Sequence, residues 1–335
     1  MEPDITADTT AAGVRPGGSA PVAPQRPATA DSLKVGRWQA PKTAVGREQE
    51  RLGWLLVVPS VLVVCLVAIY PLFQTIRLSF TNERLASTRE ARNVGFDNYQ
   101  RMLSDDLFWQ SLRNTAIFTV SSVTLEAVLG MIVALAIHSN FRGRGLVRTS
   151  MLVPWAIPTV VSSVLWGWMF HDRFGFINSL FQKLGILADG DNRAWVESTG
   201  TALAAVVAID VWKTTPFMAL LLLAGLQIIP SDVYEAAYVD GASKWQQFWQ
   251  ITLPLVRPAL LVALIFRTMD SFRVFDLIYV LKGAATETMT IAIYTQQTLI
   301  QNQRLGLGSA GAVLIFICIA MMVAGYSRLI QVEEN

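Results

Sequence analysis

Six long apolar segments are the feature that most restricts the fold of this 335-residue chain. Each is long enough to cross about 30 Å of hydrocarbon at about 1.5 Å per helical residue. Inside a bilayer every backbone N–H and C=O must be bonded within the protein, and no segment alternates like a membrane β-strand. We therefore predict an all-α integral membrane fold with six transmembrane helices, at Leu52–Phe73, Leu112–Ile137, Thr149–Phe170, Thr201–Leu223, Pro258–Val280 and Ser309–Ile330.

The composition supports a membrane protein and excludes several functions. Hydrophobic residues make up 53% of the chain and charged residues 16%, and the formal net charge of +2 argues against nucleic-acid binding. Cys65 and Cys318 lie in apolar runs, so we expect both to be buried apolar residues. His138 and His171 belong to opposite membrane faces, so we predict no metal site and no catalytic residue.

The first 48 residues differ in composition from the rest. They are rich in Pro, Ala, Thr and Gly and have no apolar periodicity, so they cannot bury enough surface to order themselves. We predict a disordered cytoplasmic tail at residues 1–48 and a six-helix domain at residues 49–335. A regulatory or docking role for the tail stays open.

The distribution of basic residues predicts the orientation in the membrane. Three arginines and no acid lie between the second and third spans, and five bases shortly precede the first span. Lys and Arg favour cytoplasmic loops, so we predict a multi-pass membrane protein with both termini on the cytoplasmic side. The loops at 74–110, 171–200 and 281–308 then lie outside, and Glu235–Pro254 lies inside between the fourth and fifth spans.

This inner stretch, Glu235–Pro254, begins inside a short helix. Ser231 or Asp232 is expected to cap that helix, and Glu235 is its third residue if Asp232 is the cap. Gly241 suits the end of the helix because glycine takes a left-handed backbone at little cost.

A second helix is predicted directly after this glycine. Ser243 and Gln246 have the spacing of a capping box, and Pro254 is expected to end the helix. The result is a helix, a glycine elbow and a helix, with aromatic and alanine side chains exposed for a groove on a partner. A plain amphipathic connector between two spans is the alternative.

The pattern Glu-Ala-Ala-x-x-Asp-Gly-Ala, eight residues, then Ile-x-Leu-Pro resembles the signature loop of bacterial ABC importer permeases. The resemblance covers residues 50–330 and implies the type I importer permease fold, in the cytoplasmic membrane of a bacterium. It also implies that the stretch is a coupling helix, which fits a groove on a cytoplasmic ATPase subunit. The residues to which the motif assigns this coupling are Glu235, Ala236, Ala237, Asp240, Gly241 and Ala242.

Four charges recur every third residue through the fifth span, with alternating sign. They are Arg267, Asp270, Arg273 and Asp276, and successive members lie close enough on a helix to pair. Charges in hydrocarbon are costly, so these residues should face protein or water. We expect Arg267 and Asp276 to be structural, and Asp270 and Arg273 to contact substrate, although structural ion pairs throughout are the alternative.

Other polar residues extend this cluster. Asp210, Lys213 and Thr214 of the fourth span are predicted to complete a polar cavity, in which aromatic rings cover the apolar faces of a sugar. Glu126 of the second span is expected to be a packing partner.

Two further features concern the helices and loops around this cavity. Pro154 and Pro158 are expected to kink the third span, because each removes a backbone donor. The segment Val94–Tyr99 resembles the corresponding outer loop of carbohydrate-uptake permeases, and a loop packed over the outer mouth is its alternative role.

The fourth span, with Val211–Phe217 followed by Leu226-x-x-Ile229-Pro230, is similar to that of disaccharide permeases of the maltose and trehalose type. Charged residues replace neutral amides of the maltose permease, which favours a sugar held by charged hydrogen bonds. The sequences of Trp212–Leu226 and of Asp240–Ser243 resemble those of trehalose-transporter permeases most. The sugar contacts that this resemblance implies are Asp210, Lys213, Thr214, Phe217, Phe266, Met269, Asp270 and Arg273.

The chain has no Gly-x-x-x-x-Gly-Lys-Ser/Thr phosphate loop, so we predict no cofactor bound by this subunit. The resemblance implies two ATPase subunits that use ATP and Mg, a second permease subunit and an extracytoplasmic sugar-binding lipoprotein. It also implies a disaccharide substrate, contact with membrane lipid and transport by alternating access. The alternatives are another polyol such as glycerol phosphate or maltodextrin, an ion-coupled secondary transporter, and a membrane-embedded enzyme.

Overall fold

The computed structural model describes residues 44–87 and 90–331. The described residues divide into two units between Val63 and Val64, and each unit is described separately. In the first unit, α1 (Ala44–Val64) begins within the last five residues of the predicted tail. The remainder of that tail lies outside the described residues, so its disorder stays a prediction.

Five helices in the described part of the chain are long and apolar enough to cross a membrane. They run over Glu50–Ser79, Asp106–His138, Ala202–Leu226, Lys244–Lys282 and Leu305–Arg328. A helix pair bent by 91°, Arg144–Ala156 with Thr159–Met169, becomes a sixth span if it is counted as one. The six predicted apolar segments correspond to these helices.

The break in the third span follows from its sequence. Ile157 has an extended backbone (ψ 131°), as a residue before proline prefers, and Pro158 has no N–H to continue the ladder. The predicted kink is therefore confirmed at Pro158. Pro154 does not cause it, because this residue lies in the first turn of α6 (Val153–Ala156), where a missing N–H costs little.

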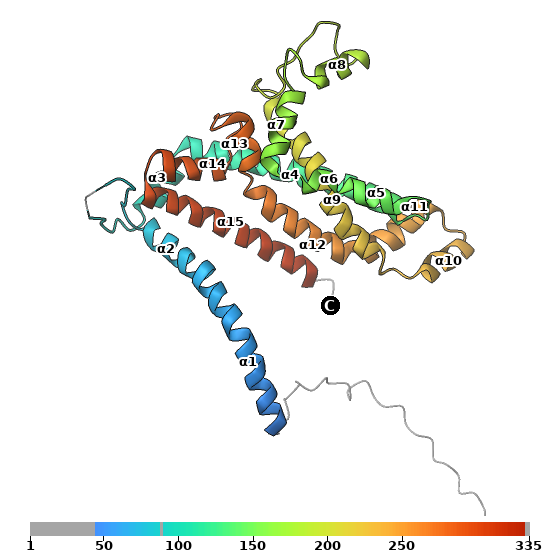
Figure 1. Cartoon of the computed structure of the whole chain (residues 1–335), viewed down its shortest axis with the longest axis horizontal. Helices are drawn as coiled ribbons and strands as arrows, with labels where there is room; N and C mark the ends of the chain where they lie inside the picture. Colours follow the sequence, from blue (N-terminus) through green and yellow to red (C-terminus); the bar gives the residue numbers. More distant parts are fainter. Residues whose placement is uncertain (1–43, 88–89, 332–335) are drawn as a thin grey trace, which may run out of the picture. The chain divides into compact units, whose positions relative to one another are not determined.

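The second unit is organised around α4 (Asp106–His138), which packs along α9 (Ala202–Leu226). Helix α12 (Leu253–Phe272) packs against both, and α15 (Leu305–Gln331) packs against α12 and α2 (Tyr70–Ser79) (Figure 1). The shorter helices are α3 (Asp97–Leu103), α5 (Arg144–Met151), α7 (Thr159–Met169), α8 (Phe176–Lys183), α10 (Ser231–Val239), α11 (Lys244–Gln247), α13 (Asp276–Lys282) and α14 (Ile291–Gln296), and π-helical turns occur at η2 (Cys65–Ile69), η3 (Phe248–Thr252) and η4 (Gln297–Gln301).

Side-chain hydrogen bonds of Asn98 and Tyr294 fix the short helices α3 and α14. The amide of Asn98 in α3 donates to the carbonyls of Ser79 and Thr81, both at 2.8 Å. The phenol of Tyr294 in α14 donates to Asp105 at 2.7 Å, and burial together with this acceptor raises the pKa of the phenol. The segment around Asn98 is thus packed against the end of α2. That it covers the outer mouth stays a prediction.

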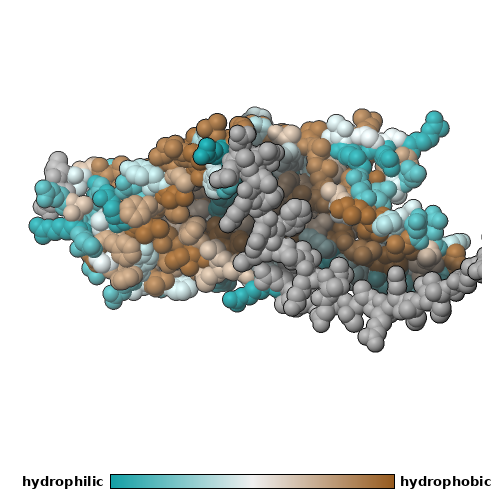
Figure 2. Space-filling model, turned by 90° about the horizontal axis from the view of Figure 1, so that it is seen from below, coloured by the Kyte–Doolittle hydropathy of each residue, from teal (hydrophilic) through white to brown (hydrophobic). Residues whose placement is uncertain are grey.

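Apolar side chains cover much of the face shown in Figure 2. Among all the described residues, large exposed apolar side chains include Val120 of α4, Trp168 of α7 and Met321 of α15. Such surfaces suit lipid or a second subunit. The expectation that both cysteines are buried was wrong: Cys65 is exposed and Cys318 is half-buried, because an apolar side chain on a membrane helix need not face protein.

Replacing Gly225 with leucine should weaken the packing of α9 on α12. A Cβ at Gly225 would lie 2.5 Å from the Cβ of Ala259 and 2.9 Å from Val256, so a side chain must push the helices apart. We expect a loss of about 1–3 kcal/mol, measured as a lower unfolding temperature of the purified protein in detergent. Gly325→Leu is the control, because its Cβ meets nothing within 4 Å. Equal losses in both variants would contradict the account.

Candidate functional site

The predicted elbow, a helix followed by Gly241 and a second helix, begins at Pro230. This proline has the extended backbone of an N-cap (ψ 141°), and α10 starts at the next residue. The predicted cap at Ser231 or Asp232 was wrong, because the chain already turns at Pro230 and both polar residues lie inside the first turn. Glu235 is consequently the fifth residue of the helix and not the third.

Gly241 ends α10 as the sequence predicted. Its φ is +81°, and its N–H donates to the carbonyl of Tyr238 at 3.0 Å. The N–H of Ala242 donates to the carbonyl of Ala237 at 2.9 Å. These two bonds are those of a Schellman motif, in which glycine avoids the strain of a left-handed backbone.

The second helix opens as predicted and ends differently. Ser243 and Gln246 form a capping box, with both reciprocal bonds present. Pro254 does not end the helix, because it lies in the first turn of α12 and the preceding turn is π-helical, with Leu253 N–H bonded to the carbonyl of Phe248. The wider turn accommodates the missing donor. Helical structure therefore runs from the elbow into the fifth span.

Hydrogen bonds within the elbow stabilise it, and apolar side chains are exposed on its surface. The hydroxyls of Tyr234 and Thr252 are 3.0 Å apart, and the side chain of Gln247 donates to the carbonyl of Ala242 at 3.0 Å. The exposed fractions of Tyr238 and Val239 are 78% and 84%. Exposed apolar side chains on a fixed bend are typical of a docking surface.

Deeper in the unit, one arginine joins three spans. Arg267 of α12 is 2% exposed and donates to Glu126 of α4 at 2.8 Å, to Asp210 of α9 at 3.1 Å and to Asp270 at 2.6 Å. Thr214 adds a bond to Glu126 at 2.6 Å. We call Arg267 and its three carboxylates the Arg267 cluster. It agrees with the structural role expected for Arg267 and with Glu126 as a packing partner.

The fifth span is interrupted where the sequence analysis assumed a continuous helix. Helix α12 ends at Phe272, Arg273 is its C-cap, and α13 begins at Asp276. A cation at a helix C-terminus and an acid at an N-terminus are both favourable. Among the described residues, only Arg267 and Asp270 of the four alternating charges form an ion pair with each other. The expected pairing of the other members was wrong because the chain leaves the helix between them.

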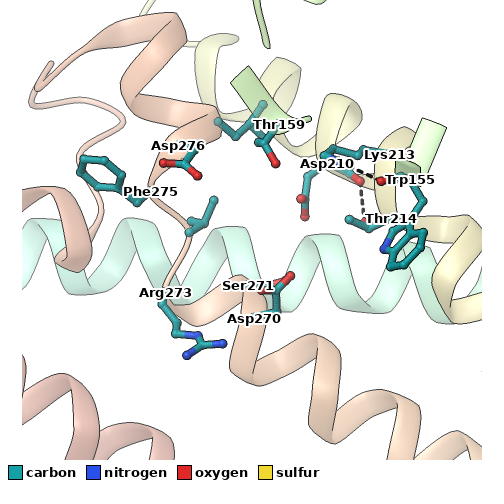
Figure 3. A pocket seen from close by; sticks show the side chains of 12 residues that line it. Trp155, Thr159, Asp210, Lys213, Thr214, Asp270, Ser271, Arg273, Phe275 and Asp276 are labelled. Carbon is teal, nitrogen blue, oxygen red and sulfur yellow. Dashed lines mark hydrogen bonds between the residues drawn. The ribbon is translucent and has the colours of Figure 1, made fainter. Parts of the chain in front are cut away.

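This interruption and the break in the third span border a cavity of about 300 Å³ (Figure 3). Side chains of α9 form one part of its lining, and the end of α12 with the start of α13 forms another. Five of the eight predicted sugar contacts line it, namely Asp210, Lys213, Thr214, Asp270 and Arg273. The sequence analysis did not include Trp155 and Thr159, which the break at Pro158 brings to the same cavity.

Three predicted contacts lie elsewhere. Phe217 stacks on Trp155 with ring centroids 5.8 Å apart, Phe266 is 56% exposed, and Met269 is half-buried. None of them lines this cavity. A sugar contact for these three residues stays a prediction.

The polar groups of the cavity differ in what they can still bind. The hydroxyl of Thr214 is shared between Glu126 and the carbonyl of Asp210. Asp270 bonds Arg267 through one oxygen, and its side chain is 65% exposed. Arg273 is exposed and has no ion pair within the described part of the chain. Asp276, which was expected to be structural, is also exposed in this lining and forms no ion pair among the described residues. Asp270, Arg273 and Asp276 are therefore the groups most available to a ligand.

Replacing Arg267 with methionine should destabilise the protein severely. The change leaves Glu126 and Asp210 buried without their cation, so we expect a loss of about 3–5 kcal/mol, measured as unfolding in detergent. The double variant Glu126→Gln/Arg267→Met removes one unpaired charge and should lose less than the two single variants together. Additive losses would show that Arg267 and Glu126 are not coupled.

Comparison with known proteins gives concordant results. Residues 126–331 match the family described as binding-protein-dependent transport system inner membrane component. A trehalose transport system permease protein of Mycobacterium tuberculosis is 39% identical over 305 residues, or 91% of this chain and 94% of the relative. A trehalose/maltose transport system permease protein of Thermococcus litoralis is 40% identical over 84% of this chain and 94% of its own.

Two further similarities bear on substrate and fold. A sulfoquinovosyl glycerol transport system permease protein of Agrobacterium fabrum is 37% identical over 84% of this chain and 91% of its own. A solved bacterial ABC transporter that imports alginate is similar with a TM-score of 0.72 over 84% of this chain and 96% of its own, at 21% identity. At that identity the similarity shows a shared fold, which is the importer permease fold that the sequence predicted.

Proposed function

Because the chain belongs to the family of binding-protein-dependent transport system inner membrane components, we propose that it is the permease subunit of an ATP-driven sugar importer. The substrate is a disaccharide, trehalose in preference to maltose, and it crosses the cytoplasmic membrane by alternating access. The subunit is a multi-pass transport component and not an enzyme. The observation that carries the proposal is a cavity between interrupted spans whose free groups are hydrogen-bonding and charged.

The chemistry of the cavity favours a neutral polyol. Its lining has three carboxylates, Asp210, Asp270 and Asp276, against two cations, Lys213 and Arg273. A phosphate or sulfonate would meet a net negative wall, whereas carboxylates and a guanidinium accept and donate hydrogen bonds to sugar hydroxyls. The relative that transports sulfoquinovosyl glycerol makes an anionic sugar derivative the alternative. Glycerol phosphate and maltodextrin are the other alternative substrates.

Binding at interrupted spans suits a transporter. Unwound segments in the membrane expose backbone groups, and transporters use such segments to hold substrate where two halves of the protein move. In this chain the interruptions at Pro158 and Arg273 both border the cavity. Movement of either half-helix would change the shape of the site.

The elbow supplies the connection to an energy source. Its fixed bend at Gly241 and the helix that continues into α12 form one lever from the inner surface to the cavity. We place the elbow and both termini on the cytoplasmic side, where an ATPase subunit docks against the exposed face of α10. The complete importer has a second permease subunit, two ATPase subunits and an extracytoplasmic sugar-binding lipoprotein; a solved alginate relative is in complex with a periplasmic protein.

The substrate prediction is tested with the complete importer in proteoliposomes. Trehalose delivered by the binding protein should stimulate ATP hydrolysis more than maltose, and glycerol phosphate should have no effect. Asp270→Asn and Arg273→Gln should each raise the half-saturating sugar concentration about tenfold, since each removes one charge-assisted hydrogen bond.

Asp189→Asn is the matched control, because this exposed acid lies in the outer loop and away from the cavity. Stimulation by an anionic sugar derivative alone would replace the disaccharide with the alternative. Unchanged half-saturation in both cavity variants would contradict the assigned site.

Replacing Gly241 with valine should uncouple ATP hydrolysis from uptake. A β-branched residue at φ +81° costs about 1–2 kcal/mol and opens the bend, while the spans remain intact. We expect sugar uptake to fall at least about tenfold with the protein still in the membrane. Gly185→Val carries similar strain (φ +71°) in the outer loop and should retain coupling. Full uptake by the Gly241 variant would refute the lever.

A further inference from the structure

The break in the third span leaves backbone acceptors without helical donors. The last four carbonyls of a helix have no N–H in the next turn, and at this break Pro158 has no N–H at all. The carbonyls of Trp155 and Ile157 lie at this break, at the C-terminal end of α6. Unsatisfied carbonyls inside a membrane protein are costly, so the bend needs donors from another element.

Lys213 of α9 supplies those donors. Its ammonium group donates to the carbonyl of Ile157 at 2.8 Å. It also donates to the carbonyl of Trp155 at 3.3 Å (Figure 3). The side chain is buried, and among the described residues no carboxylate lies within ion-pairing distance of it. An ammonium group has three donors, so two of them are used by the bend.

The same face of α9 makes a second contact with the bend. Phe217 lies one helical turn after Lys213, and its ring stacks on Trp155 at an interplanar angle of 12°. Trp155 is therefore fixed twice, by its carbonyl through Lys213 and by its indole through Phe217. Both residues were predicted to contact sugar, yet both contact the broken span.

We propose that Lys213 is a positioning residue that caps the broken end of α6. Together with Phe217 it holds the 91° bend, which places Trp155 and Thr159 on the wall of the cavity. The bend itself is a property of this chain, and only its effect on uptake rests on the proposed function. Lys213 thus acts on transport through the shape of the site.

The bend is measured as a distance between two spin labels in the assembled complex without sugar. Val147→Cys in α5 and Trp168→Cys in α7 replace exposed residues, in a background with serine at Cys65 and Cys318. At about 1.5 Å per residue, the two backbones are about 22 Å apart across a right-angled bend and about 32 Å apart in a straight helix.

We expect Lys213→Met to shift the distance distribution from the shorter value towards the longer one. Lys213→Arg should keep the short distance, because a guanidinium group can donate to both carbonyls. The maximal rate of trehalose uptake should fall about tenfold in the methionine variant and recover in the arginine variant.

Thr215→Val is the matched control on the same helix. Its hydroxyl is buried without a hydrogen-bond partner among the described residues, so the nearly isosteric change should leave distance and uptake unaltered. An unchanged distance in a folded Lys213→Met complex would overturn the proposal. A raised half-saturating concentration with that unchanged distance would make Lys213 a sugar ligand instead. If the unsubstituted complex did not transport trehalose, the proposed function would be contradicted. The distance measurement would still test the role of Lys213 in the bend.

Discussion

A guanidinium group buried among carboxylates of three helices is the constraint on which the second unit depends. Arg267 has almost no exposed surface, so Glu126, Asp210 and Asp270 must stay where they compensate its charge. Arg267, Glu126 and Asp210 are removed from water, which is costly unless each has its partner in place, whereas the side chain of Asp270 stays largely exposed. The arrangement therefore fixes α4, α9 and α12 relative to one another. It also holds Asp270 at the edge of the cavity with part of its carboxylate free.

Two spans near the Arg267 cluster are interrupted, and nearby charged side chains stabilise each interruption. At Pro158 the free carbonyls bond Lys213, and at Arg273 the exposed helix ends meet charges of suitable sign. The cavity thus lies beside backbone that a bilayer alone would not tolerate. Asp270 of the Arg267 cluster lies only three residues before the interruption at Arg273, so a fixed charge cluster and an irregular backbone segment are neighbours beside the cavity.

Local rules allowed much of this to be predicted from the sequence. The length of the apolar segments predicted the spans, and Gly241 predicted the end of α10. The missing backbone donor of proline predicted the break at Pro158, but also a kink at Pro154 that is absent. Contacts between distant residues were less accessible: periodicity suggested that Arg273 pairs along one helix, but the helix ends there. Likewise nothing in the local sequence shows that Lys213 reaches carbonyls more than fifty residues earlier, because that contact exists only once α6 packs on α9.

The central claim is that sugar binds beside an intact Arg267 cluster, and that the elbow at Gly241 transmits motion to that place. The most direct measurement is a structure of the complete importer with trehalose bound. The account predicts density for the sugar against Asp270 and Arg273, with Arg267 still bonded to Glu126 and an ATPase subunit in contact with α10. Sugar bound elsewhere while this cavity stays empty, or an elbow with no ATPase contact, would contradict it.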